Sequence, residues 1–336
     1  MYKLVLCISL CLPMTAQADR WPAALLSGSP ELLTFSLLQE KPEGYRPVAS
    51  RLARDAGLIG DPGLRQTRLR FAPAVAWDDN INGGIPGADI RLGPFDFRVD
   101  EASRAKEGVV VGFDAGAGAD WAFGNGSMAT LDTDLAWRHS PQHGLGWAAG
   151  QAEACLSKVY QLWRRIEGCL SVRGAERALS STVTHRASIE HRSQHALSFG
   201  DAELVVGLFA EDRFGIVQQG VSFGAVVATD HALVWGLRLN LGAGVGGRSA
   251  ATVTATTWVA RELWGEPTSL SVNYVHEEGS SLFGTPREDD VYSVRITRRV
   301  TEQLSIFAGA SARSSTVDVF DDKTVTAGVT IAGWRR

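Results

Sequence analysis

Residues 109–121 read Val-Val-Val-Gly-Phe-Asp-Ala-Gly-Ala-Gly-Ala-Asp-Trp, and every odd-numbered position in this stretch is apolar. Apart from Val110, the even-numbered positions hold only glycine or aspartate. Successive side chains of a β-strand point to opposite faces. The stretch therefore predicts a strand with one oily face and one face that is polar or small.

The same period of two recurs along the chain and is clearest at 129–137, 233–245 and 325–331. Weaker examples lie at 69–77, 145–157, 163–173, 179–191, 202–210, 216–227, 251–263, 270–276, 291–299 and 304–313. We therefore expect an all-β fold, a transmembrane antiparallel β-barrel of about 14 strands over residues 66–336. The apolar spacing within residues 151–166 also fits a helix.

Composition excludes several other classes of protein. An apolar content of 45% is too high for a disordered chain. A mean hydropathy of −0.03 does not fit a bundle of membrane helices. A net charge of −4 gives no basic excess, so we expect no nucleic-acid partner.

A secreted β-sandwich or soluble barrel is the alternative fold. Its water-facing side would carry more Lys, Glu and Thr than the Gly, Asp and Arg found on the second face here. Tryptophans at the predicted strand ends favour a membrane barrel, because Trp is enriched at membrane interfaces. These are Trp77, Trp121, Trp137, Trp264 and Trp334.

The first segment indicates secretion. Lys3 precedes an apolar core over residues 4–12, and Ala16-Gln17-Ala18 fits signal-peptide cleavage after Ala18. We expect residues 1–18 to be a signal peptide and the mature protein to lie in the outer membrane of a Gram-negative bacterium.

Residues 19–65 differ from the barrel and predict a short periplasmic or plug segment that is partly helical. Residues 47–56 predict a helix with Pro in its first turn and Gly just after its end, and residues 32–38 fit a helix or a strand. The segment could be a periplasmic cap, a plug in the lumen, a docking site for a partner, or a poorly ordered leader.

The predicted connections alternate in length. Residues 78–107 and 277–290 predict long loops, whereas 124–127, 229–231 and 301–303 predict tight turns. Long loops on one side and short turns on the other are typical of an outer-membrane barrel.

Strand parity predicts which charges face the lumen. We interpret them as an ion-paired wall, a polar conduit, or both. The principal residues are Asp114, Asp120, Asp132, Asp134, Arg138, Arg186, Arg238 and Arg295, and the same parity adds Arg165, Glu167, Arg173, Glu190 and Arg299.

The same parity places Cys155 and Cys169 on the inward side. They are the two cysteines left after signal-peptide cleavage, and a disulfide between them would require a turn near Leu162. Two free thiols are the alternative.

No motif for catalysis, a cofactor or a metal is present, so we expect no enzymatic activity and no cofactor. Ser188 and His191 would lie on opposite faces of one strand. Oxygen-bearing residues at 78–89 could hold a cation or could simply form turns.

Two regions resemble the barrel domain of the surface lipoprotein assembly modifier family. One is Trp77-Asp-Asp79-Asn80-Ile-Asn82-Gly-Gly with Leu92-Gly-Pro-Phe95, residues 102–108 and the strand up to Trp121. The other is residues 281–299, including Arg287-Glu-Asp-Asp290. The resemblance implies a barrel of fourteen strands that moves lipoproteins or secreted proteins to the cell surface. Members usually carry tetratricopeptide repeats before the barrel and end on an aromatic residue, and this chain has neither feature.

The resemblance makes translocation or surface display of lipoproteins or secreted proteins the principal functional prediction. A diffusion channel for small polar solutes is the alternative, and a surface adhesion or structural barrel is the third. The expected partners are outer-membrane lipid, a lipoprotein or secreted cargo, and a periplasmic chaperone or repeat protein.

Overall fold

The computed structural model describes residues 20–332, apart from residues 86, 93–94, 283–284, 302 and 318–319. The predicted signal peptide and Trp334 lie outside the described residues. Within these residues, no helix is both long and apolar enough to cross a membrane.

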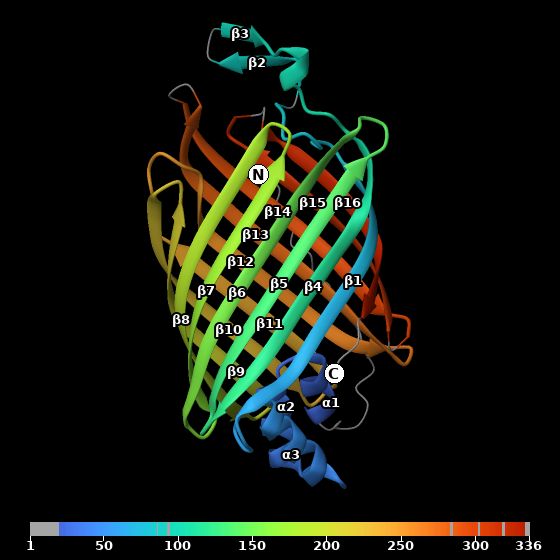
Figure 1. Cartoon of the computed structure of the whole chain (residues 1–336), viewed down its shortest axis with the longest axis vertical. Helices are drawn as coiled ribbons and strands as arrows, with labels where there is room; N and C mark the ends of the chain where they lie inside the picture. Colours follow the sequence, from blue (N-terminus) through green and yellow to red (C-terminus); the bar gives the residue numbers. More distant parts are fainter. Residues whose placement is uncertain are drawn as a thin grey trace.

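Fourteen antiparallel strands form one closed barrel, in which each strand pairs with its neighbours in sequence and β1 closes against β16 (Figure 1). The predicted fold class is confirmed. The strands are β1 (Gly63–Asp78), β4 (Gly108–Gly124), β5 (Ser127–Ser140), β6 (Leu145–Gln161), β7 (Arg164–Arg177), β8 (Ser180–Leu197), β9 (Gly200–Arg213), β10 (Ile216–Thr229), β11 (Leu233–Gly242), β12 (Ala250–Leu263), β13 (Glu266–Leu282), β14 (Thr285–Arg299), β15 (Leu304–Ser315) and β16 (Asp322–Ala332).

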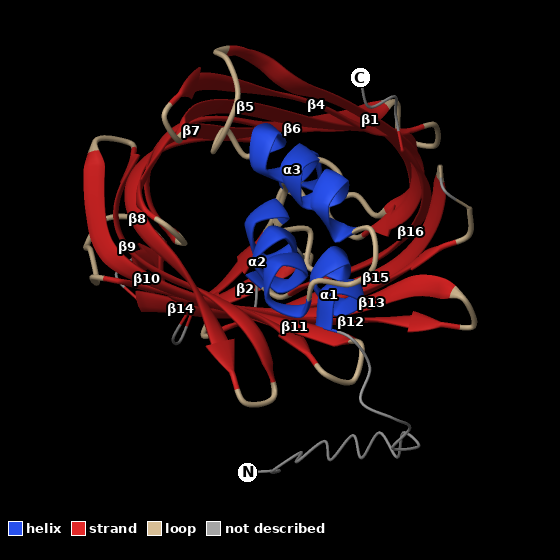
Figure 2. Cartoon of the chain, turned by 90° about the horizontal axis from the view of Figure 1, so that it is seen from below, coloured by secondary structure: helices blue, strands red, loops and turns tan. Residues whose placement is uncertain are grey.

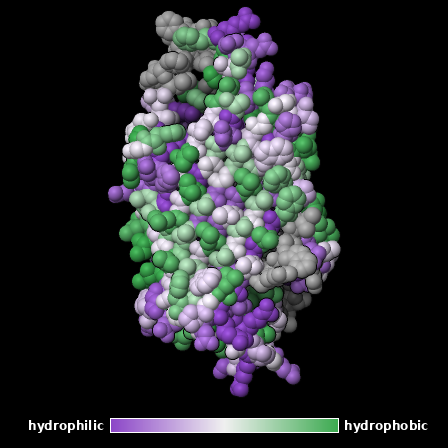
Figure 3. Space-filling model, viewed as in Figure 1, coloured by the Kyte–Doolittle hydropathy of each residue, from purple (hydrophilic) through white to green (hydrophobic). Residues whose placement is uncertain are grey.

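The alternate apolar residues of the strands lie on the outside of the barrel. Leu69, Leu131, Leu170 and Leu208 are all more than half exposed, although each lies within a strand. Figure 3 shows hydrophobic side chains over the middle of one face and hydrophilic ones toward both ends. Apolar side chains are more stable in hydrocarbon than in water, so the outer surface suits lipid.

Three of the tryptophans predicted to mark strand ends also project from the wall. Trp77, Trp121 and Trp137 lie near strand ends and are between 42% and 49% exposed. Trp264 lies in the turn between β12 and β13 and is 82% exposed. This placement fits two interfacial girdles.

The turns at the lower end of Figure 1 are short. Asn125 and Gly126 both have positive φ, and so do Trp264 and Gly265, as expected for two-residue hairpin loops of type I′. The upper end carries residues 79–107, which contain the hairpin of β2 (Asp89–Leu92) and β3 (Phe95–Arg98) and the 3-10 helix η1 (Glu101–Ser103). By the usual loop asymmetry, we assign the lower end to the periplasm.

One predicted long loop is wrong. Residues 277–290 belong mostly to β13 and β14, with Glu277 opposite Asp289 and Ser280 opposite Arg287. The polar sequence suggested a loop, but strands that extend beyond the membrane have water on both faces and do not need apolar residues.

Several strand boundaries also differ from those predicted. The first strand begins at Gly63 rather than at residue 69, and the strand predicted over 233–245 ends at Gly242. Residues 151–161 form the second half of β6, so the helical interpretation of this region is wrong. Cross-strand pairing on both sides of β6 decides between the two periodicities there.

Three helices precede the barrel: α1 (Arg20–Leu26), α2 (Pro30–Glu40) and α3 (Tyr45–Asp55). Ser29 caps α2, since its hydroxyl accepts the Leu32 N–H at 3.1 Å. Figure 2 shows the helices across the lower opening of the barrel, and we call residues 20–55 the plug segment. Residues 32–38 are therefore helical, and the predicted helix over 47–56 corresponds to α3.

Candidate functional site: the barrel lumen

The polar parity of the strands lines the lumen. Asp120 of β4 bonds Arg68 of β1, which also bonds Asp132 of β5 at 3.0 Å. The next pair along the same strands repeats this pattern, because Arg70 of β1 bonds Asp134 of β5. These contacts form a continuous ion-paired wall over three neighbouring strands.

The glycines between these charges have a structural reason. A Cβ added to Gly118 would lie 2.3 Å from Asp132 Oδ1 and 2.9 Å from Arg68 Nη2. Gly116 stands in the same relation to Asp134 and Arg70. The glycines of β4 therefore leave the space in which the ion pairs form.

Sequence reasoning missed Arg68 and Arg70. Arg68 lies one residue before the predicted strand over residues 69–77, whereas Arg70 lies within it. The apolar Leu69, Phe71 and Val75 are odd-numbered, so the even-numbered residues of this strand face the lumen. This alternation was the signal that could have located Arg70, and extending the strand by one residue would have found Arg68.

Asp114 and Arg138 form a second contact on the β4–β5 wall. Arg138 Nη2 lies 2.7 Å from Asp114 Oδ1, and its Nη1 donates to the Phe113 carbonyl oxygen at 2.8 Å. Arg138 is 7% exposed, so this guanidinium is buried in its contacts with the barrel wall.

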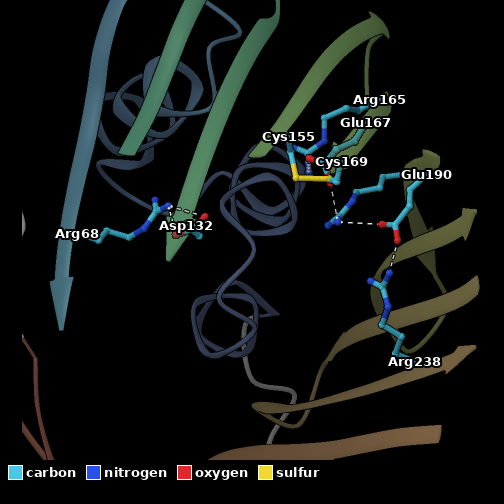
Figure 4. The surroundings of a disulfide bond; sticks show 9 residues. Arg68, Asp132, Cys155, Arg165, Glu167, Cys169, Glu190 and Arg238 are labelled. Carbon is cyan, nitrogen blue, oxygen red and sulfur yellow. Dashed lines mark hydrogen bonds and ion pairs between the residues drawn. A yellow bond between two sulfur atoms is a disulfide. The ribbon is translucent and has the colours of Figure 1, made fainter. Parts of the chain in front are cut away.

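A second charged network lies on strands β7, β8 and β11. Arg192 bonds Glu167 at 2.8 Å and Glu190 at 3.1 Å, and Arg238 also bonds Glu190 (Figure 4). Glu190 is only 4% exposed, so its two arginine partners offset the cost of burying the carboxylate. Arg192 is another residue that sequence reasoning missed.

The two cysteines lie beside this network (Figure 4). Cys155 of β6 and Cys169 of β7 are directly opposite in the register, with Cα atoms 4.1 Å apart, and a disulfide joins them. The turn between the two strands falls at Leu162 and Trp163. Glu153 lies close enough to form a three-residue group with the sulfurs, but the disulfide occupies both thiols.

The plug segment is bonded to the wall. Arg20 of α1 contacts Asp201 at 3.3 Å and Asp230, and Glu31 of α2 contacts Arg165 of β7. Burial lowers the pKa of the Arg20 guanidinium, but the two carboxylates outweigh burial and the net shift is upward.

Further contacts of the plug segment are neutral or apolar. The Ser29 hydroxyl donates to Glu203 Oε2 at 2.9 Å, and Phe35 packs edge-on against Trp163, with ring centroids 5.0 Å apart. Ala23, Ala24 and three leucines of α2 form an apolar cluster with Ala228 of β10; the leucines are Leu32, Leu33 and Leu37. The segment is thus folded against the barrel interior rather than standing free of it.

Two cavities occupy the lumen. The lower one has a volume of about 840 Å³ and lies between the plug segment and the wall, with Arg68, Arg165, Arg192 and Arg238 among its lining residues. The upper one has a volume of about 1010 Å³ and is lined by strand residues together with Arg248 and Ser249 of the loop between β11 and β12. Arg186 and Arg295, both predicted to face the lumen, line the upper cavity.

The residues of the family-like motif fall into two separate networks. Asn82 is 3% exposed and orders the upper loop: its Nδ2 donates to the Arg104 carbonyl oxygen, and its Oδ1 accepts the Lys106 N–H at 2.9 Å. Asn80 Nδ2 donates to the Gly84 carbonyl oxygen at 2.9 Å, and Asp79 Oδ2 accepts the Lys323 N–H at 2.6 Å.

The second half of the motif lies on the β13–β14 hairpin. Arg287 donates to Asp289, while Asp290 accepts hydrogen bonds from the Tyr274 hydroxyl at 2.7 Å and pairs with His276 at 3.0 Å. Asp290 has the opposite parity to Asp289, so it lies on the outer face. In the structure these residues organise loops and strand ends.

The oxygen-bearing residues near residue 78 are already bonded to protein groups. Asp78 Oδ1 accepts the Asn80 N–H and Oδ2 accepts Trp147 Nε1 at 2.8 Å. Arg177 lies 3.5 Å from the same carboxylate. These contacts favour the turn interpretation of the segment over cation binding.

Comparison with known proteins gives fold-level similarity only. No family model and no curated protein matches the chain. Pseudomonas putida OprB superimposes with a TM-score of 0.46 at 9% identity, covering 86% of this chain and 96% of that one. The outer membrane protein OpdK of Pseudomonas aeruginosa gives 0.42 at 9%, covering 81% and 98%. OprD of the same organism gives 0.38 at 10%, covering 84% and 97%.

Proposed function

We propose that the protein is a diffusion channel for small polar solutes across the outer membrane. The observation that supports this most directly is a closed barrel with a lipid-compatible outside and a charged lumen that contains two cavities of about 1010 and 840 Å³. Solutes that keep their polar groups hydrated or hydrogen-bonded can enter such a lumen without crossing hydrocarbon.

The ion-paired wall suits this role. Its paired guanidinium and carboxylate groups offset one another, which keeps the wall polar without a strong field of one sign. The plug segment narrows the lower opening but leaves the lower cavity beside it. The channel we propose is therefore restricted in size rather than wide.

Liposome swelling tests the proposal. Purified full-length protein in liposomes should raise the swelling rate in isotonic arabinose above that of empty liposomes, and boiled protein should not. A protein that migrates as a folded barrel in unheated gels but gives no swelling would contradict the channel function.

No specific observation supports the translocation role expected from the family resemblance or the expected cargo and chaperone partners. None supports the adhesion role either. Both remain predictions, and a diffusion channel is the function that the lumen geometry favours.

A further inference from the structure

The upper cavity has an uneven distribution of charge. Six arginines and four carboxylates line its volume of about 1010 Å³. The arginines are Arg70, Arg173, Arg186, Arg213, Arg248 and Arg295, and the carboxylates are Asp114, Asp134, Glu211 and Glu277.

Each of the four carboxylates already has a cationic partner. Arg138 lies 2.7 Å from Asp114, and Arg70 bonds Asp134. Arg248 lies 3.8 Å from Glu211, and Arg313 lies 3.6 Å from Glu277. The acidic groups of the cavity therefore make their direct ionic contacts with arginines other than Arg173, Arg186 and Arg295.

Among the described residues, four arginines of the cavity form no ion pair with a carboxylate: Arg173, Arg186, Arg213 and Arg295. Arg186 lies over the Phe209 ring, 3.9 Å from its centroid, and Arg295 lies over the Phe307 ring at 3.8 Å. The rings hold the guanidinium groups by their faces, which leaves their N–H edges available to an acceptor. A single weak contact, 3.4 Å from Arg186 Nη2 to Asn240 Oδ1, uses part of this capacity.

Arg173, Arg186 and Arg295 border the same space from two sides. Arg173 of β7 is opposite Thr184, so Arg186 is its diagonal neighbour on β8, about 7–8 Å away between strand positions. Arg295 lies on β14, on the far side of the ring with β9 to β13 between. Two nearby carboxylates, Glu211 opposite Arg186 and Glu153 beside Arg173, form no ion pair with either.

We propose that the upper cavity is a binding site for small oxyanions, carboxylates or phosphates, held by Arg173 and Arg186 on one wall and Arg295 on the other. Guanidinium forks match the two oxygens of such groups, and low-dielectric walls concentrate the field of unpaired charges. This site deepens the proposed channel function, since it would make the channel select for anions.

Equilibrium dialysis of labelled succinate against the detergent-solubilised full chain measures the site without requiring conduction. Arg186→Gln and Arg295→Gln should each weaken binding about tenfold, because each removes a charge-assisted hydrogen bond. The control is Arg261→Gln, which changes an arginine of the outward parity on β12 and should leave binding unchanged.

Competition defines the ligand class. Inorganic phosphate should displace succinate if the site recognises oxyanions in general, and failure of phosphate with retention of succinate restricts the site to carboxylates. Displacement by glycerol, or equal succinate binding by all three variants, would overturn the proposal. Unheated gel mobility identifies a misfolded variant, and the milder Arg186→Lys and Arg295→Lys then replace it.

Reversal potentials distinguish failure of the proposed anion site from failure of the proposed channel function. In a KCl gradient, the full chain should prefer chloride, and the two glutamine variants should lose much of that preference. Succinate binding without any conductance would contradict the channel function and leave the site intact, whereas conductance without anion preference or succinate binding would overturn the site alone.

Discussion

At the scale of single residues, the lumen wall is organised by pairs of opposite charge whose spacing depends on glycine. Arg68 reaches Asp120 and Asp132 across the space above Gly118, and no side chain at that position would leave it open. Among the described residues, Arg173, Arg186 and Arg295 lack such partners, and all three line the upper cavity. Charge balance therefore differs between the two halves of the lumen.

The contact of Arg20 with Asp201 predicts how firmly the plug segment is attached. Asp201 is fully buried, so Arg20→Gln leaves a buried carboxylate with less compensation and should weaken attachment by about 3 kcal/mol. Limited proteolysis of residues 20–55 should accelerate roughly a hundredfold. Arg51→Gln, which changes an exposed pair on α3, is the matched control and should behave like the unaltered protein. Equal cleavage rates in both variants would show that Arg20 does not hold the segment.

The alternation of strand β14 predicts a contrast between adjacent residues. Val294 faces outward and is 44% exposed, whereas Ser293 faces the lumen between Asn273 and Ser311. Val294→Lys should destabilise the barrel by about 2–4 kcal/mol in a bilayer, because a charge then enters hydrocarbon. Ser293→Lys should cost less than about 1 kcal/mol. Urea unfolding from lipid vesicles measures both, and similar losses would contradict the assigned faces.

At the scale of elements, the sequence predicted most of what depends on a period of two. The strand around residues 109–121 and its lumen-facing Asp114 and Asp120 follow directly from alternation. The β13–β14 extension did not, because residues 277–290 are polar on both faces and strand pairing outside the membrane leaves no hydrophobic pattern. Arg192 was missed although it shares the inward parity of Arg186 and Glu190, and its partners could not be known without the register.

The hairpin of β6 and β7 predicts a redox dependence of stability. The disulfide closes a segment in which the cysteines are 14 residues apart, and a loop of this size contributes up to about 3 kcal/mol through the unfolded state. Reductant should lower the urea midpoint of the native protein and leave the Cys155→Ser, Cys169→Ser double variant unchanged. A midpoint that reductant does not move in either protein would show that the crosslink adds no stability.

The plug segment predicts the size of the pathway. Deletion of residues 20–55 removes the helices that bound the lower cavity, so arabinose-driven liposome swelling should become faster and larger sugars should begin to pass. The deletion must retain the unheated gel mobility of a folded barrel. An unchanged swelling rate and size limit would show that the narrowest point lies elsewhere in the lumen.

At the scale of the whole molecule, a closed ring of strands separates two environments. The outward, apolar face of the strands suits lipid, and closure of the ring leaves no sheet edge. The inward, polar face encloses two cavities and a folded N-terminal segment. Both faces come from the same alternation, so the membrane location and the proposed channel function depend on one structural feature.

Single-channel recording of the purified full-length protein in a planar bilayer tests this account most directly. We predict discrete and repeatable conductance steps, absent with heat-denatured protein. Folded protein that inserts into the bilayer and never produces such steps would contradict the central claim that the lumen is a passage for solutes.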